Sequence, residues 1–214
     1  MTADLRLCFV GDSFVNGTGD DEALGWAGRI CRAARGRNVQ LTRYDLGVRR
    51  DTTALILRRC ATEVAARLDG VPCDGRVVFS FGTNDATHKE GRPRVEPADT
   101  LANTRTVLDW SRGRYPTLMV GPPPLATDLG HDTRVGAISA AMARLCVEMG
   151  IPFLNLHGPL SDDATWRAEA VAGDGAHPNA DGYARAAALI EAWEPWRAWT
   201  TPSGYPLHKG GGEE

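Results

Sequence analysis

Five short apolar segments alternate along the chain with longer segments whose apolar residues recur at helical spacing. This alternation constrains the fold more than any other feature, because strands that are each followed by a helix return to the same end of a sheet and pair in parallel. The expected strands lie at residues 5–10, 39–44, 76–81, 117–120 and 152–156. The pattern predicts an α/β fold, a three-layer α/β/α sandwich around a five-stranded parallel sheet of flavodoxin-like order.

Helices are expected between these strands and after the last of them. Apolar residues at helical spacing place the helices at residues 24–34, 54–68, 97–111 and 132–150, with a last helix around residues 183–190. Asp51 or Thr52 is expected to cap the second helix. Asp132 or Thr133 is expected to cap the fourth. The segment between the last strand and the last helix shows no clear periodicity.

Length and composition bound the domain organisation. The 214 residues are enough for one sizeable core, and no repeat or change of composition marks a boundary. The sequence therefore predicts a single domain over residues 1–200 and a tail, residues 201–214, that is flexible at its end. Trp193, Trp196 and Trp199 stand three residues apart and are expected to pack on the core, which would hold the C-terminal segment in place.

Charge and cysteine content exclude several classes of partner. The net charge is -3 and charges of both signs are interspersed, so no basic stripe predicts nucleic-acid binding. The five cysteines are odd in number without C-x-x-C spacing, which favours buried free thiols in a reducing compartment. No apolar run approaches the roughly 18 residues of a membrane-spanning helix, and no secretion signal is evident. We expect a cytoplasmic protein with a small-molecule partner, no nucleic acid and no membrane insertion; the sequence does not indicate whether it forms homo-oligomers.

The first expected strand ends at the tripeptide Gly11-Asp12-Ser13, and residues 14–21 after it have the composition of a loop. In open α/β sheets, ligands bind beyond the carboxyl ends of the strands, so a serine at this place can face a substrate. By itself the tripeptide is more often an ordinary turn from a strand to a loop. Its interpretation therefore depends on the polar residues that follow the other strands.

Three other segments bring polar groups to the same edge of the expected sheet. A serine hydroxyl needs a base to accept its proton, and the base needs an orienting carboxylate. His177 and Asp174, three residues apart before the last helix, can supply both groups for Ser13. Acyl transfer also requires donors for the oxyanion, and the backbone N–H groups of Ser13 and Gly47 and the side-chain amide of Asn84 are placed to provide them. The pattern predicts a serine hydrolase.

These four segments resemble the sequence blocks of the SGNH hydrolases, also called the GDSL esterase/lipase family, in both order and spacing. The matching residues are Gly11-Asp12-Ser13-Phe14, Gly47, Gly82-Thr83-Asn84-Asp85 and Asp174-Gly175-Ala176-His177-Pro178. The resemblance extends from Gly11 to about Ile190. It implies a flavodoxin-like sandwich and a carboxylic ester hydrolase that forms an acyl-enzyme on Ser13.

The chain departs from the family pattern at three positions. Phe14 replaces the leucine that gives the GDSL motif its name. Asp45 stands where an asparagine is common, and Arg50 stands where a second glycine is common. The last two changes place charge beside the expected cleft, which indicates a substrate preference different from that of typical relatives.

Other polar residues are better explained by structural roles. His88 lies in a polar loop and is expected to be solvated, while Asp12 and Asp85 are expected to accept nearby backbone N–H bonds. His131 and His157 have no evident partner in the sequence. No Cys/His spacing predicts a metal site, and no glycine-rich phosphate-binding motif follows a strand, so no metal and no cofactor are expected.

The sequence leaves the substrate and two other function classes open. A small or short-acyl ester is favoured because residues 121–124, Gly-Pro-Pro-Pro, predict a firm wall and no long apolar lid is evident. A lysophospholipid, an acyl thioester and an O-acetylated sugar remain alternatives. A non-catalytic ligand-binding module is disfavoured because Ser13, Asn84 and His177 are all present. A flavin-binding protein of flavodoxin type would carry a bound chromophore.

Overall fold

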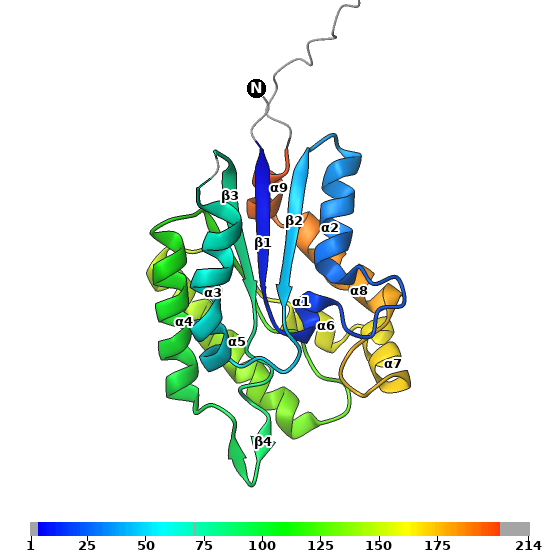
Figure 1. Cartoon of the computed structure of the whole chain (residues 1–214). Helices are drawn as coiled ribbons and strands as arrows, with labels where there is room; N and C mark the ends of the chain where they lie inside the picture. The colour runs from blue at the N-terminus through cyan, green and yellow to red at the C-terminus, as the bar shows by residue number, and fades with distance from the viewer. Residues whose placement is uncertain (1–3, 71, 202–214) are drawn as a thin grey trace, which may run out of the picture.

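The computed structural model describes residues 4–70 and 72–201 and confirms the α/β/α sandwich (Figure 1). One five-stranded sheet has the spatial order β2-β1-β3-β6-β7, and all of its pairs are parallel. Its strands are β1 (Leu5–Gly11), β2 (Leu41–Gly47), β3 (Asp74–Ser80), β6 (Thr117–Val120) and β7 (Phe153–Leu154). This is the flavodoxin-like order, in which the sheet grows from β1 first to one side and then to the other.

Helices cover both faces of the sheet. On one face α3 packs beside α4 and α4 beside α5; on the other α2 packs beside α8, which also contacts α7 and α9. Their bounds are α2 (Gly25–Gly36), α3 (Thr53–Leu68), α4 (Pro97–Arg112), α5 (Leu129–Met149), α7 (Ala164–Ala172), α8 (Ala180–Ala192) and α9 (Glu194–Trp199). Because both faces are covered, the interior strand β1 is almost entirely apolar and buried, as parallel strands usually are.

The strand register determines where the site forms. Gly11, at the end of β1, lies level with Gly47 at the end of β2 and with Ser80 at the end of β3. The segments that follow these three strands therefore leave the sheet at one common edge. A small hairpin, β4 (His88–Lys89) and β5 (Arg92–Pro93), projects at the same end of the molecule (Figure 1). It forms where a polar loop is expected.

Several element boundaries differ from the sequence predictions. The second strand spans residues 41–47, whereas residues 39–44 are predicted, because β2 runs on beside β1 as far as Gly47. Three short helices are not predicted at all, since fewer than about three turns give too little periodicity to recognise. These are α1 (Ser13–Asn16), α6 (His157–Ser161) and α9. The helix α7 also lies in the segment that shows no clear periodicity in the sequence.

Of the two predicted helix caps, that of α3 is confirmed in position and that of α5 is wrong. Thr52 occupies the N-cap position of α3, but no side-chain hydrogen bond forms there. The carboxylate of Asp85, from another segment, instead accepts the N–H of Thr53 at 3.0 Å. The helix α5 begins earlier than predicted because Asp128 is its N-cap and accepts the N–H of His131 at 2.8 Å.

The C-terminal tryptophans pack on the core, as predicted. The side chain of Trp196 is fully buried, and those of Trp193 and Trp199 are partly buried against the core cluster. The indole N–H of Trp196 donates to Glu191 at 2.6 Å, which satisfies its one polar group. The predicted flexible end of the chain falls on residues 202–214, outside the described residues.

Two further sequence predictions concern the thiols and the membrane. Cys8, Cys31, Cys60 and Cys146 are buried free thiols, and burial raises their pKa values to between about 11 and about 12. Within residues 4–70 and 72–201, every helix is too short or too polar to cross a membrane.

Candidate active site

Ser13 is the first residue of the four-residue helix α1, directly beyond the end of β1. Asp12 is the N-cap of this helix, and its carboxylate accepts the N–H of Phe14 at 3.0 Å. Gly17 ends the helix in the left-handed conformation, with φ of 75°. Since the N–H groups of a first helical turn precede any acceptor within the helix, the N–H of Ser13 is available to a ligand.

The loop before α8 holds Asp174 and His177 in one turn. One carboxylate oxygen of Asp174 accepts the backbone N–H groups of Ala176 at 3.0 Å and His177 at 2.9 Å. Its other oxygen lies 2.8 Å from Nδ1 of His177. Gly175 between them has φ of 87°, a conformation that favours glycine, and its carbonyl accepts the hydroxyl of Thr127 at 2.9 Å. The turn therefore fixes the carboxylate and the imidazole relative to each other.

His177 connects this loop to Ser13. Its Nε2 lies 2.8 Å from Oγ of Ser13, while Nδ1 faces Asp174. A carboxylate can only accept, so the arrangement assigns the ring proton to Nδ1 and leaves Nε2 free to accept the serine proton. The structure thus brings together Ser13, His177 and Asp174 in the order that nucleophilic catalysis needs.

Asp174 is held as a carboxylate. Partial burial acts to raise its pKa, but the hydrogen bonds from the backbone N–H and imidazole of His177 and from the N–H of Ala176 outweigh it and lower the pKa to about 2. The guanidinium of Arg49 lies 4.0 Å from the same carboxylate oxygen that faces the imidazole. Asp174 therefore carries a negative charge at neutral pH.

Three aromatic rings pack in series beside the imidazole of His177. The ring of Phe14 lies 4.7 Å from the ring of His177 and stacks on Trp166 at 6.0 Å. Trp166 in turn packs edge-on against Tyr183, whose hydroxyl donates to the carbonyl of Thr18. The departure from leucine at position 14 thus adds a ring that restricts the orientation of His177. Trp166 lies where the sequence shows no clear periodicity, so its position could not be predicted.

Gly47 packs directly against α1. A Cβ atom at this position would meet the backbone N of Asn16 at 2.3 Å, so only glycine lets β2 and α1 approach so closely. Its N–H, the predicted oxyanion donor, donates to the carboxylate of Asp45 at 3.0 Å. An oxyanion that uses the N–H of Gly47 must therefore share this donor with the Asp45 carboxylate or displace the carboxylate from it.

Asn84 follows β3 and lies beside the N-cap of α1. Its side-chain amide donates to the carbonyl oxygen of Asp51 at 3.0 Å and lies 3.4 Å from the Asp12 carboxylate. The second contact is long and weak, so one amide hydrogen can turn towards a ligand at little cost. The register of the strands places the segments that carry Asn84, Ser13 and Gly47 at the common edge of the sheet.

Buried carboxylates surround these donors. Asp12 is 1% exposed; burial, with the nearby charges of Asp85 and Asp51, raises its pKa to about 7, although the N–H of Phe14 and the amide of Asn84 act in the opposite direction. Burial also raises the pKa of Asp85, whose carboxylate accepts the hydroxyl groups of Thr53 and Thr100. The expected structural roles of Asp12 and Asp85 are confirmed, although Asp85 joins segments far apart in sequence.

Of the remaining histidines, His131 and His157 contact residues on other elements. His88 is exposed on β4. Nε2 of His131 lies 2.9 Å from the carbonyl oxygen of Thr83, and Nε2 of His157 lies 3.0 Å from the carboxylate of Asp132. These partners are not evident in the sequence because they lie on separate elements. His208 lies outside the described residues.

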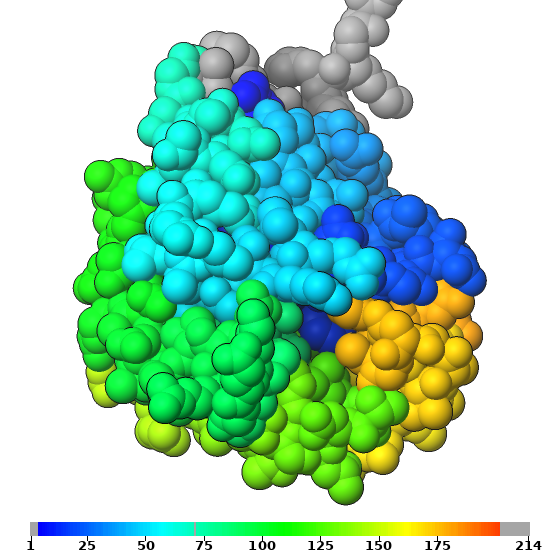
Figure 2. All heavy atoms as spheres, turned by 60° about the horizontal axis from the view of Figure 1, so that its bottom comes forward, coloured from blue at the N-terminus to red at the C-terminus, as the bar shows by residue number. Residues whose placement is uncertain are grey.

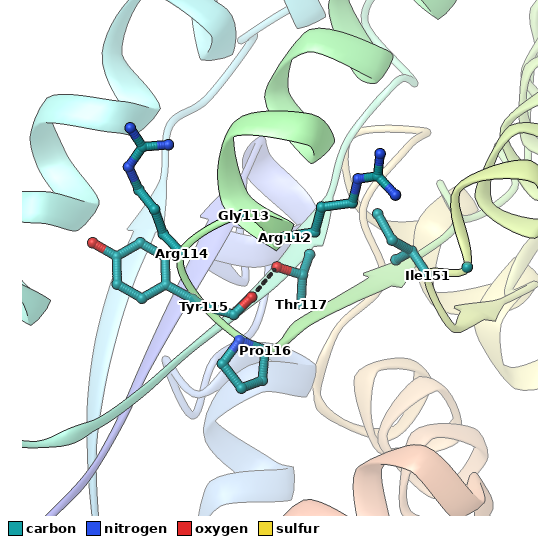
Figure 3. A pocket seen from close by; sticks show the side chains of 8 residues that line it. Arg112, Gly113, Arg114, Tyr115, Pro116, Thr117 and Ile151 are labelled. Carbon is teal, nitrogen blue, oxygen red and sulfur yellow. Dashed lines mark hydrogen bonds between the residues drawn. The ribbon is translucent and has the colours of Figure 1, made fainter.

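A hollow opens at the common edge of the sheet, seen end-on in Figure 2. Blue atoms from the N-terminal part of the chain lie at its floor. Cyan atoms after β2, the green hairpin and the orange loop before α8 border it. A second hollow of about 340 Å³ lies at the opposite edge, between Arg112 and Thr117 at the start of β6 and beside Ile151 (Figure 3). Because parallel strands start at one edge and end at the other, this second hollow is remote from Ser13.

The family model described as GDSL-like lipase/acylhydrolase matches residues 9–185. A search of curated proteins finds no match.

Solved structures with the same fold include three hydrolases, each less than 25% identical to this chain. A lipase/acylhydrolase from Enterococcus faecalis has a TM-score of 0.73 and 22% identity, over 92% of this chain and 95% of its own. The psychrotrophic esterase EstA from Pseudoalteromonas sp., inhibited by monoethylphosphonate, has a TM-score of 0.70 and 14% identity, over 92% and 98%. Axe2, an acetylxylan esterase from Geobacillus stearothermophilus, has a TM-score of 0.70 and 17% identity, over 91% and 98%.

Proposed function

The chain belongs to the GDSL-like lipase/acylhydrolase family and is an ester hydrolase, and from this premise we propose that it cleaves small carboxylic esters through an acyl-enzyme on Ser13. One observation carries the proposal: two contacts of 2.8 Å link Ser13 to His177 and His177 to Asp174. A nucleophile, its base and the carboxylate that orients the base are thereby in line.

In the first half of the proposed reaction, Oγ of Ser13 attacks the ester carbonyl carbon while its proton passes to Nε2 of His177. The imidazolium that forms is stabilised by the carboxylate of Asp174, which stays ionised. When the tetrahedral intermediate collapses, the bond to the alcohol oxygen breaks, and His177 returns the proton to that oxygen. The acyl group remains on Ser13.

The negative charge on the carbonyl oxygen needs fixed donors. The N–H of Ser13 at the start of α1 is the first of the proposed donors, and the amide of Asn84 is the second. The N–H of Gly47 is the third, once it is shared with the oxyanion. In the second half of the reaction, a water deprotonated by His177 attacks the acyl carbon. The bond to Oγ of Ser13 then breaks, His177 returns the proton to that oxygen, and the carboxylic acid is released.

The preference for small substrates is supported by the wall after β6. Residues 121–124 are buried, and the indole N–H of Trp166 donates to the carbonyl of Pro124 at 3.2 Å. Proline fixes its own φ and cannot rearrange easily, so this wall resists the widening that a long acyl chain would need.

The test is hydrolysis of 4-nitrophenyl esters from acetate to laurate, with an acyl thioester and an acetylated sugar alongside. Wild type is expected to turn over acetate and butyrate with kcat/KM falling along the series, and Ser13→Ala is expected to be inactive on all of them. Equal rates in wild type and Ser13→Ala would refute the role of Ser13. A maximum at laurate would refute the small-substrate proposal alone.

A further inference from the structure

Two of the segments that border the hollow in Figure 2 are rich in exposed positive charge. Together they carry five exposed or part-exposed cations. These are Arg49 and Arg50 after β2, and Lys89, Arg92 and Arg94 on the β4–β5 hairpin and just after it. The whole chain carries a net charge of -3, so this local excess of positive charge is not a property of the surface in general.

Most of these cations lack an ionic partner. Among the described residues, no carboxylate lies within 4.0 Å of Arg50, Lys89, Arg92 or Arg94. The guanidinium of Arg49 lies 4.0 Å from Asp174, but the side chain remains 61% exposed. That single carboxylate offsets at most one of the five positive charges.

Arg50 occupies its position at a cost. Its φ is 66°, in the left-handed region that is unfavourable for a residue with a Cβ atom. A glycine would avoid this cost, and Arg50 stands where a second glycine is common among SGNH hydrolases. A strained, charged side chain at the mouth of a catalytic hollow is a candidate for ligand binding.

We propose that the natural substrate is an ester that also carries an anionic group, a carboxylate, phosphate or sulfate, which Arg49 and Arg50 bind at the mouth of the hollow. Guanidinium groups suit this task because their N–H groups match two oxygens of an oxyacid at once. The cations of the hairpin add a long-range field that attracts the same anion. This proposal rests on the proposed ester hydrolysis and specifies its substrate class.

The experiment compares matched pairs of esters that differ in one charge. One pair carries the anion on the acyl side, mono-4-nitrophenyl succinate against 4-nitrophenyl butyrate. The other carries it on the alcohol side, 4-acetoxybenzoate against phenyl acetate. The readout is the ratio of kcat/KM for the anionic member to that for the neutral member, measured in wild type and in Arg49→Gln/Arg50→Gly. Dividing one ratio by the other cancels the intrinsic reactivity of the esters.

The glycine in the double variant accepts the φ of position 50 without strain, which keeps the loop folded. The matched control is Arg105→Gln/Arg144→Gln, which removes two exposed charges from the outer surface of α4 and α5. We expect the double variant to lower the ratio about 10-fold for at least one pair, and the control to leave it unchanged. The preference of wild type should also fall in 0.5 M NaCl, because salt screens exposed charges.

A ratio that is the same in wild type and in the double variant for both pairs would overturn the anionic-substrate proposal, while hydrolysis of the neutral esters would leave the esterase proposal intact. An equal fall in the control would overturn it as well, since the effect would then not depend on the mouth of the hollow. Inactivity of wild type on all four esters would instead refute the esterase proposal, and the anionic substrate with it.

Discussion

Two places in the molecule bring together a serine, a histidine and an aspartate, and only one of them has the geometry of a catalytic group. In the first, Ser13, His177 and Asp174 are joined by two contacts of 2.8 Å. In the second, Ser161 lies 3.4 Å from His157, whose other ring nitrogen lies 3.0 Å from Asp132. The residue types are the same, so the difference must come from how the backbone presents them.

The two serines sit at opposite ends of their helices. Ser13 is the first residue of α1. The N–H of Phe14 there donates to Asp12, but the N–H of Ser13 has no acceptor within the helix and can stabilise an anion. Ser161 is the last residue of α6, where carbonyl groups face outward and would repel one. Its hydroxyl donates instead to the carbonyl of His157, one turn earlier, at 2.7 Å. A reactive serine therefore needs donors beside it as well as a base.

The contacts of Asp132 indicate the role of the second group, Ser161, His157 and Asp132. Its carboxylate accepts the N–H of Leu125 at 2.8 Å and lies within 3.0 Å of His157, so it joins the segment after the proline wall to α5 and α6. Asp174 makes local contacts of the same kind but directs its imidazole at a hydroxyl from a distant segment. We interpret the Ser161 group as structural.

The largest expected effect separates the two serines. Ser13→Ala should lower kcat on 4-nitrophenyl acetate by about 10⁶-fold, the loss typical when a serine nucleophile is removed. Ser161→Ala should stay within about twofold of wild type, because it removes only one hydrogen bond within α6. A large loss of kcat in Ser161→Ala, in a variant with an unchanged circular dichroism spectrum, would reverse the comparison.

The next largest difference in kcat is expected between variants of Asp174 and Asp132. Asp174→Asn should lower kcat by about 10⁴-fold, since an amide no longer stabilises the imidazolium and favours the wrong tautomer of His177. Asp132→Asn keeps an acceptor oxygen for Leu125 and should leave kcat unchanged, with a loss of about 1 kcal/mol or less in the free energy of unfolding. Steady-state kinetics and urea denaturation measure both effects. Similar kcat values for the two variants would contradict the assignment.

A smaller effect tests the donors that distinguish the first group. Asn84→Ala should lower kcat by about 10²- to 10³-fold with little change in KM, because an oxyanion donor acts on the transition state. Asn155 is a matched control: its side chain contacts Ser139 and Gly158 near the second group, and Asn155→Ala should retain kcat. A change confined to KM in Asn84→Ala would show that the amide binds substrate rather than the oxyanion.

The smallest expected effect is an increase in kcat. The carboxylate of Asp45 shares the N–H of Gly47, and a negative charge roughly 5 Å from an oxyanion costs about 1 kcal/mol even in a water-like dielectric. Asp45→Asn keeps the acceptor oxygen and removes the charge, so kcat should rise about 5-fold at pH 8.

The gain should depend on pH in a defined direction. Burial raises the pKa of Asp45, although the N–H of Gly47 and the charge of Arg43 oppose this. The wild-type side chain therefore loses its charge at a higher pH than an ordinary aspartate, and the advantage of Asp45→Asn should shrink as the pH falls. A ratio of variant to wild type that is constant from pH 8 to acid pH would contradict an electrostatic effect.

The sheet and the residues of the first group could be predicted because their signals are local. Each long strand and helix repeats its pattern over many residues, and Ser13, Asn84 and His177 each follow a recognisable strand or precede a recognisable helix. The stacking of Trp166 on Phe14 and the bond from Thr53 to Asp85 could not be predicted, because they join segments whose separation in space is decided only by packing. The occupation of the Gly47 donor by Asp45 depends on a side-chain rotamer, which the sequence does not determine.

The most direct test of the account is covalent labelling with an alkyl 4-nitrophenyl phosphonate, which reacts only with an activated nucleophile. Peptide mapping by mass spectrometry should place one adduct per chain on the peptide that contains Ser13, with activity lost in proportion to labelling. Ser13→Ala should remain unlabelled, and Ser161→Ala should label like wild type. An adduct on Ser161, or complete labelling of Ser13 with activity retained, would contradict the assignment of Ser13 as the nucleophile.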